Sequence, residues 1–448
     1  MRWSACALGC VGVACVTFGS HAALDRSPEV VAPAVAATKP AVVPSKRPLP
    51  TIALSATGDI TLGEDGTYPR GGARALLKGV RKHLRGDVVL GNLETVLGDG
   101  TRARQLGGAP TCPEPPDPCF NFIAPAAFAL GLRASGLTIL NLANNHAFDF
   151  GRIGETMTIE ALASARLRWT GKPAQVTSLR ASRIRVAVIG AAPYPWAQNL
   201  LDVPGTARLV RNAAHRAQVV IVTMHLGAEG AGADHVRPGM ETFFGERRGD
   251  PVAFAHAMVD AGADLIVGHG PHVLRGLEWY RGRLIAYSLG NLSGFHTLST
   301  AGALGIGAIL HVRLRANGAF LDGKLTPIRL DPAGAPRLDP TRAAFVLLRQ
   351  LSRADFGGRA VRITKTGSLR VAVPTRRMSS RGPLGWAGAQ LTMLVEADVA
   401  CSELTLLAPV AATRSVEPTS AAVGTYVRPI APSIGAHAAP VALQRDHA

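Results

Sequence analysis

The chain has 448 residues, of which 47% are apolar, and it contains 49 glycines and 31 prolines. This composition excludes a wholly disordered chain and indicates a globular body of two or three domains with some extended segments. The net charge of +17 allows an acidic polymer, anionic lipid or nucleic acid as partner, but no dense Lys/Arg run alternates with aromatic residues, so no nucleic-acid partner is expected and the charge indicates an arginine-rich surface.

The N-terminus has the pattern of a secretory signal peptide. Arg2 precedes an apolar stretch, and the small residues Ser20 and Ala22 predict that residues 1–22 are cleaved off. A lipoprotein signal ending at Cys10 is the less favoured alternative, because the apolar stretch before that cysteine is very short. No later segment reaches the apolar length that spans a bilayer, which predicts a mature protein that is secreted or located in the periplasm or cell envelope.

Cys112 and Cys119 bracket a proline-rich loop, whereas three of the six cysteines lie in the predicted signal peptide. In an oxidising compartment this arrangement favours a local disulfide. A zinc site is the weaker interpretation, because no second pair of cysteines or histidines lies nearby in the sequence.

Residues 23–50 are rich in proline, alanine and valine and are predicted to form a linker. Short apolar strands then alternate with polar loops and amphipathic stretches. The predicted strands are residues 51–59, 87–94, 137–146, 184–191, 219–227 and 264–270, and the predicted helices include residues 73–84 and 250–263, with Asp250 as a cap. Apolar strands alternating with helices predict an α/β body with both faces of its sheet covered.

A hairpin-like turn at Gly282 precedes a strand predicted over residues 283–292. The predicted folded domain, residues 51–330, closes near Leu330. Residues 331–373 are expected to extend this domain with a helix over 340–353 and a hairpin over 359–373. Residues 374–448 have little periodicity and are predicted to be mostly disordered.

Polar side chains follow the predicted strands at the points where the strands end. Ligands of open α/β sheets bind outside the carboxyl ends of the strands, so these groups can converge although they lie far apart in the sequence. The residues concerned are Asp59, Asn92, Glu94, Asn144, Asn145, His146, His225, His269 and His272. Singly, most have an ordinary structural explanation, such as a helix cap for Asp59, whereas His269 and His272 around Gly270 and Pro271 are hard to explain as core or surface residues. Their recurrence at successive strand ends predicts one site.

The mixture of carboxylate, amide and imidazole groups suits one or two divalent ions such as Mn, Zn or Fe better than a metal that prefers thiolates. Two adjacent ions bridged by a carboxylate would supply a hydroxide nucleophile and bind a phosphoryl or carbonyl oxygen. A histidine beside them that is not a ligand can protonate the leaving group. The residues therefore predict metal-assisted hydrolysis or transfer.

Five segments resemble the ordered motifs of the CapA family, which are capsule-synthesis or poly-gamma-glutamate biosynthesis proteins. They are GDITLG (residues 58–63), GNLET (91–95), NLANNHAFDFG (141–151), MHLGAEG (224–230) and the long segment 260–291. The resemblance covers residues 51–330, and residues 347–357 are similar to the family's C-terminal extension. It implies a fold similar to the calcineurin-like metallophosphoesterases, an α/β layered sandwich with helices flanking mixed β-sheets.

The resemblance also implies roles for individual residues. The implied metal ligands are Asp59, Glu94, Asn145, His225, His269 and His272. Glu94 stands where metallophosphoesterases have a bridging aspartate, and His146 stands where they have the acid near the leaving group. Asn92 and Glu229 are expected beside the ligands, and Asp149 is expected to shape the turn after His146.

The sequence departs from the metallophosphoesterase pattern at Thr61, where that pattern has a ligating histidine. Together with the signal-peptide pattern, the resemblance implies an exported protein that makes or processes an anionic envelope polymer of the poly-gamma-glutamate capsule type. It would act as a metal-dependent hydrolase or transferase, with other capsule-synthesis proteins as partners. One alternative, favoured by Thr61, is a non-catalytic component that binds or anchors the polymer in an export assembly. The other is a general metallophosphodiesterase with a phosphoester substrate.

Overall fold

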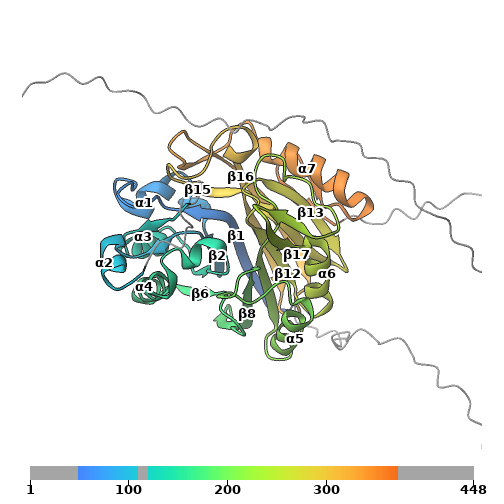
Figure 1. The fold of residues 1–448 in the computed structure, drawn as a ribbon. Helices are drawn as coiled ribbons and strands as arrows, with labels where there is room; N and C mark the ends of the chain where they lie inside the picture. Colours follow the sequence, from blue (N-terminus) through green and yellow to red (C-terminus); the bar gives the residue numbers. More distant parts are fainter. Residues whose placement is uncertain (1–48, 109–119, 372–448) are drawn as a thin grey trace, which may run out of the picture. The chain divides into compact units, whose positions relative to one another are not determined.

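The computed structural model describes residues 49–108 and 120–371 (Figure 1). The predicted signal peptide (residues 1–22), nearly all of the predicted linker, the Cys112–Cys119 pair and the tail after residue 373 lie outside the described residues. Those features therefore stay predictions.

The first of two large sheets has ten strands, and its main order is β19-β20-β17-β16-β1-β2-β5-β6, with β15 beside β1 and β18 beside β17. Strands β1, β2, β5 and β6 are parallel, and β16 runs antiparallel to β1. The strands are β1 (Thr51–Thr61), β2 (Val88–Leu93), β5 (Ile139–Asn141), β6 (Arg168–Thr170), β15 (Asn291–Gly294), β16 (Ile306–Arg315), β17 (Phe320–Leu330), β18 (Pro336–Leu338), β19 (Arg362–Ile363) and β20 (Ser368–Arg370).

The second large sheet has six strands in the order β13-β14-β12-β9-β8-β7. Its four inner strands are parallel, and the edge strands β13 and β7 are antiparallel to their neighbours. The strands are β7 (Thr177–Ala181), β8 (Ile184–Ala191), β9 (Val219–His225), β12 (Leu265–His269), β13 (Leu274–Tyr280) and β14 (Arg283–Leu289). Two short pairs lie apart from these sheets, β3 (Val96–Leu97) with β4 (Ile123–Ala124) and β10 (Glu241–Phe243) with β11 (Glu246–Gly249).

The two sheets pack face to face, and helices cover their outer faces (Figure 1). The central core joins Leu54 and Val88 of the first sheet to Ile221 and Leu265 of the second. Helices α1 (Gly72–Leu76), α3 (Phe128–Ala134) and α4 (Gly151–Ser164) pack on the first sheet, and α5 (Val203–Ala214) and α6 (Pro251–Asp260) pack on the second. This arrangement confirms the predicted α/β layered sandwich with helices flanking mixed sheets.

The remaining helices are α2 (Gly100–Gln105), α7 (Ala343–Phe356) and five short 3₁₀ turns, η1 (Leu77–Gly79), η2 (Arg81–His83), η3 (Asn145–Phe148), η4 (Gly302–Gly305) and η5 (Gly357–Arg359). Helix α7 packs against β13, and β20 pairs with β17 of the first sheet. The chain after residue 330 therefore shares a sheet with the residues before it. Among the described residues, no helix combines the length and the apolar character needed to cross a bilayer.

Three predicted elements differ from the structure. The helix predicted over residues 73–84 ends at Leu76 and continues as the two turns η1 and η2, where the chain passes so close to β18 that a Cβ on Gly79 would lie 2.4 Å from Pro336 O. The strand predicted over residues 137–146 ends at Asn141, because the Asn141 side chain bonds to the backbone of Ala143 and replaces the strand ladder there.

The strand predicted over residues 283–292 is two strands, because the chain changes direction at Gly290. That residue has a φ of 67°, which favours glycine. After it the chain leaves the second sheet, and β15 pairs in parallel with β1 of the first sheet. This switch places Asn291 opposite Asp59, at the edge where the candidate site lies.

His311 of β16 is held neutral inside a chain of hydrogen bonds. Ser55 donates its hydroxyl to Arg85 O at 2.6 Å, so it accepts the proton of His311 Nδ1 at 2.9 Å. The unprotonated Nε2 then accepts from Thr326 Oγ1 at 2.9 Å. Burial and neighbouring positive charges lower the pKa of His311 to about 4.

We expect His311→Gln to remove part of the acid sensitivity of the fold. Below the ordinary histidine pKa of about 6.5, the unfolded chain binds a proton at His311, whereas the folded chain binds it only near pH 4. The free energy of unfolding therefore decreases as the pH falls from about 6.5 to about 4. Between pH 7 and pH 5 the loss is on the order of 2 kcal/mol. This loss is measured by urea unfolding of the wild type, of His311→Gln and of the control His215→Gln, which replaces an exposed histidine, at both pH values. Equal losses of unfolding free energy between pH 7 and pH 5 in all three proteins would contradict the assignment.

Candidate metal centre

Parallel strands bring the predicted polar side chains to one edge of the sandwich. In the first sheet Asp59 lies opposite Asn92, and Asn92 lies opposite Asn141. In the second sheet His225 lies opposite His269. All five residues are at or near the carboxyl ends of their strands, so both sheets supply side chains to the same place.

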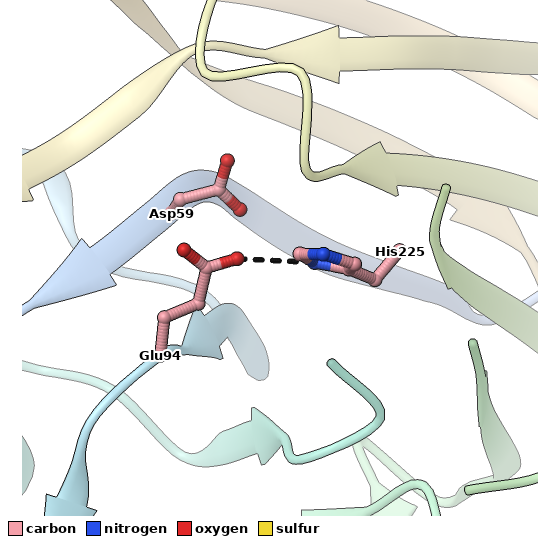
Figure 2. A group of neighbouring side chains, drawn as sticks. All are labelled: Asp59, Glu94 and His225. Carbon is pink, nitrogen blue, oxygen red and sulfur yellow. Dashed lines mark ion pairs between the residues drawn. The ribbon is translucent and has the colours of Figure 1, made fainter. Parts of the chain in front are cut away.

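Asp59, Glu94 and His225 form a group, called the triad below, whose side chains point toward one another (Figure 2). Each offers one ligand atom, and these atoms all lie within 4.8 Å of one another. Glu94 Oε1 is 3.0 Å from His225 Nδ1, and all three residues are 0% exposed. Two carboxylates and an imidazole are thus buried together, an arrangement that costs free energy unless positive charge balances it.

Asn92 fixes the triad from within. Its side-chain nitrogen donates to Asp59 Oδ1 and to Glu94 Oε1, both at 2.8 Å. Its oxygen accepts from the side chains of Asn141 at 2.8 Å and Asn144 at 3.1 Å. Because both ends of the amide are engaged, Asn92 holds the two carboxylates in place.

His269 and Gly270 complete the surroundings of Asp59. His269 Nδ1 lies 3.4 Å from Asp59 Oδ1, and the backbone nitrogen of Gly270 donates to Asp59 Oδ2 at 3.2 Å. Gly270 has a φ of 106°, and a Cβ there would lie 3.1 Å from His225 Nε2. Only glycine lets the backbone approach the triad this closely without strain.

His272 is oriented by Asn291, the first residue of β15, where the chain passes from the second sheet to the first. His272 Nδ1 lies 2.9 Å from Asn291 Oδ1, which can only accept, so Nδ1 carries the proton. The other nitrogen, Nε2, lies 3.8 Å from Glu94 Oε2 and 3.6 Å from Glu229 Oε2. His272 also has a φ of 59°, a backbone conformation that is rare outside glycine and is common at functional sites.

The electrostatics of the cluster favour positive charge. Burial alone would raise the pKa of Asp59, but the neighbouring His269 and His272 hold it well below its usual range. Burial disfavours the charged form of His272, but Glu94, Asp59 and Glu229 outweigh this effect and raise the pKa of His272 to about 10. The carboxylates thus create a buried negative field that a cation would relieve.

Several buried atoms of the cluster have no hydrogen-bond partner within the described chain, which bears directly on metal binding. They are Glu94 Oε2, His225 Nε2 and both ring nitrogens of His269, and Asn145 Oδ1 in η3 is likewise buried without a partner. Each such atom costs roughly 1–3 kcal/mol if it stays unsatisfied. Carboxylate, amide and imidazole atoms are the donors that Mn, Zn and Fe accept, so the residues present fit a divalent metal centre.

His146 lies in η3 and is oriented by Asp149. Its Nδ1 is 3.0 Å from Asp149 Oδ2, and its ring lies 4.4 Å from the Phe122 ring. Asp149 also accepts from Phe122 N at 2.7 Å, so it holds the imidazole as well as shaping the turn. Burial disfavours the charged imidazole, but Asp149, Glu94 and Glu229 together raise the pKa of His146 above its ordinary value.

Three side chains at the cluster, those of His146, Glu229 and His272, are partly exposed to solvent. Their exposed fractions are 12%, 13% and 9%, whereas those of the triad residues Glu94 and His225 are 0%. A substrate would therefore meet His146 and Glu229 before it reached the triad.

Arg248 in β11 is a residue of this side that the sequence did not indicate. Its Nη1 lies 2.8 Å from Glu229 Oε1, and its Nε lies 2.8 Å from Glu246 Oε2. Its guanidinium also lies over the Tyr194 ring, 5.7 Å from the centroid. Arg248 thus fixes Glu229, whose other oxygen faces His272.

The hydroxyl of Thr61 is engaged by residues outside the set predicted for the site. This hydroxyl lies 2.5 Å from Thr297 Oγ1 and 3.4 Å from Ser293 O. The position where metallophosphoesterases have a histidine is therefore occupied here by a buried hydroxyl that is already bonded.

The predicted site residues fall into two groups. The structure brings seven together, namely Asp59, Asn92, Glu94, His225, Glu229, His269 and His272. His146 is near enough to them that the charges of Glu94 and Glu229 raise its pKa. Asn145, its neighbour in η3, has a buried side-chain oxygen without a partner in the described chain. Their roles as ligands and acid remain predictions.

Both the family model and two related proteins that match this chain are described as capsule or polyglutamine synthesis proteins. The family model described as bacterial capsule synthesis protein PGA_cap matches residues 53–294. A probable polyglutamine synthesis accessory protein of Mycobacterium tuberculosis is 30% identical over an alignment of 366 positions that covers 72% of this chain and 86% of that protein. The capsule biosynthesis protein CapA of Bacillus anthracis is 30% identical over an alignment of 251 positions that covers 50% of this chain and 56% of that protein.

Among solved structures, a 5'-nucleotidase precursor from Thermus thermophilus is similar with a TM-score of 0.36 and 16% identity. The match covers 68% of this chain and 59% of the nucleotidase.

Proposed function

The chain belongs to the family of bacterial capsule synthesis proteins, and from this premise we propose that it is a metal-dependent hydrolase or transferase that processes an anionic envelope polymer of the polyglutamate type. The relatives' names supply the class of polymer. The buried triad with unpaired ligand atoms beside it supports the metal-dependent chemistry.

The residues of the cluster would have different roles in binding the metal. Asp59, Glu94 and His225, with His269 and His272 beside them, would hold the metal, and Asn92 positions both carboxylates by donating to one oxygen of each. A bound divalent ion would supply a hydroxide nucleophile and polarise the phosphoryl or carbonyl oxygen of the bond to be broken.

His146 would complete the reaction as the acid. Asp149 engages Nδ1, so Nε2 is the atom that can give a proton to the leaving group. The carboxylates of Asp149, Glu94 and Glu229 raise the pKa of His146, which favours the protonated imidazole. Arg248 binds Glu229 and so keeps a carboxylate at the entrance to the cluster.

Export of the protein is part of the proposal. It is supported by the signal-peptide pattern of residues 1–22, and a net charge of +17 suits an acidic polymer outside the cytoplasm. Attachment through Cys10 as a lipoprotein is the less favoured route.

The proposal is tested on purified protein by metal analysis and two substrates. We expect bound Mn, Zn or Fe, metal-dependent hydrolysis of bis(p-nitrophenyl) phosphate, and a decrease in the length of poly-gamma-glutamate. Protein stripped with a chelator and then reloaded serves as the control.

Two outcomes would replace the proposal. Absence of metal and of turnover would favour a non-catalytic component that binds or anchors the polymer, the function to which the bonded hydroxyl of Thr61 points. Hydrolysis of the phosphodiester without any change in the polymer would favour a general phosphodiesterase.

A further inference from the structure

A basic groove lies between β7, the edge strand of the second sheet, and α5. Its volume is about 680 Å³. Four arginines line it, Arg168, Arg180, Arg185 and Arg216. All four are exposed.

The arginines of the groove have no negative partners among the described residues. No aspartate or glutamate lines the groove, and none of the four guanidinium groups forms an ion pair within the described ranges. Arg185 Nε donates to Arg216 O at 2.9 Å, and Arg168 Nη1 lies 3.4 Å from Ser178 O. Elsewhere on the protein, arginines such as Arg248 and Arg313 are paired with carboxylates, so this groove concentrates unbalanced positive charge.

The groove is separate from the metal centre. Arg185 lies at the start of β8, and Arg216 lies just before β9, whereas His225 is the last residue of β9. A strand rises about 3.3 Å per residue, so β9 alone separates the groove from the triad by roughly 20 Å. In Figure 1, β8 and α5 lie at the end of the sandwich away from β15, the strand that borders the metal centre.

We propose that this groove binds a carboxylate-rich polymer chain at a distance from the metal centre. Guanidinium groups bind carboxylates through paired, charge-assisted hydrogen bonds. Between the arginines, Val176, Leu179 and Leu209 provide an apolar lining that suits the methylene groups of such a chain.

The same lining argues against a nucleic acid as the occupant. Single-stranded nucleic acids are usually bound by aromatic side chains on which the bases stack, and no aromatic residue lines the groove. The preference for carboxylates over phosphates rests on the proposed function. A chain held here would stay at high effective concentration near the metal centre between reaction cycles.

The test measures binding without turnover. The variant Arg180→Ser/Arg216→Ser removes two charges from the groove, and Arg74→Ser/Arg81→Ser removes two charges from another arginine-lined hollow as the matched control. Binding of a fluorescent poly-gamma-glutamate oligomer is followed by anisotropy in the presence of a chelator. We expect the affinity to fall at least about tenfold for the groove variant, about 1.4 kcal/mol, and less than about twofold for the control.

Each outcome decides the proposal. Equal losses in the two variants would mean that general surface charge attracts the polymer, and no loss in the groove variant would mean that the groove does not bind it. Tighter binding of a DNA or polyphosphate oligomer of equal charge to the same groove would replace carboxylates with phosphates as its ligand. Because the chelator removes any metal-dependent reaction, failure of the proposed catalytic function would leave this result unchanged.

Discussion

Replacing Glu94 with glutamine is expected to abolish metal binding and metal-dependent turnover while leaving the fold intact. The substitution keeps the size of the side chain and an oxygen that can accept from Asn92. It removes one of the two triad carboxylates from a fully buried position. Even partners outside the ligand set change metal affinity by about 10- to 100-fold, so we expect a loss of at least about 100-fold for a ligand itself.

The effect on turnover should be larger than the effect on affinity. A metal ion that polarises the reacting group contributes several kcal/mol to the transition state, and each 1.4 kcal/mol is about tenfold in rate. Turnover of Glu94→Gln should therefore fall on the order of 1,000-fold or more. The unfolding temperature gives a second readout, because bound metal stabilises the folded state by about 2.7 kcal/mol at 100 times its dissociation constant.

Added Mn²⁺ should therefore raise the unfolding temperature of the wild-type protein and leave that of Glu94→Gln unchanged. Glu160→Gln, on the exposed face of α4, removes the same charge away from the cluster and should behave as wild type. A Glu94→Gln protein that binds metal with wild-type affinity would show that Glu94 is not a ligand.

The strand-end pattern predicted the central part of the candidate site from the sequence. Asp59, Glu94 and His225 each follow an apolar run, and parallel pairing brings such ends to one edge within each sheet whatever their separation in the chain. The face-to-face packing of the two sheets then brings Asp59 and Glu94 beside His225. The sandwich followed from the same strands, because residues buried on both faces require a covering layer on each side.

The contacts that orient these residues could not be predicted in the same way. Asn291 reaches His272 because the chain changes sheets at Gly290, and a single apolar run over residues 283–292 gives no sign of that change. Arg248 lies in β11, a short polar strand without the alternation that marks a half-buried strand. Asp149 follows His146 in a turn sequence, and its bond to the imidazole depends on the local 3₁₀ geometry.

Replacing His146 with glutamine is expected to lower turnover most for substrates whose leaving group needs a proton. p-Nitrophenolate leaves readily without protonation, whereas phenolate is a poorer leaving group. Loss of a general acid costs roughly 100- to 10,000-fold, so hydrolysis of diphenyl phosphate should fall within this range. Hydrolysis of bis(p-nitrophenyl) phosphate should fall clearly less, because its transition state depends less on the proton that His146 would supply.

Metal content separates this role from a structural one. His146→Gln should retain the wild-type amount of metal, because the buried triad lies outside its contacts with Asp149 and Phe122. His215→Gln, at the exposed end of α5, should match the wild type with both substrates. Equal losses on the two esters would contradict the acid role, since a residue that only positions the substrate or the metal would slow both reactions alike.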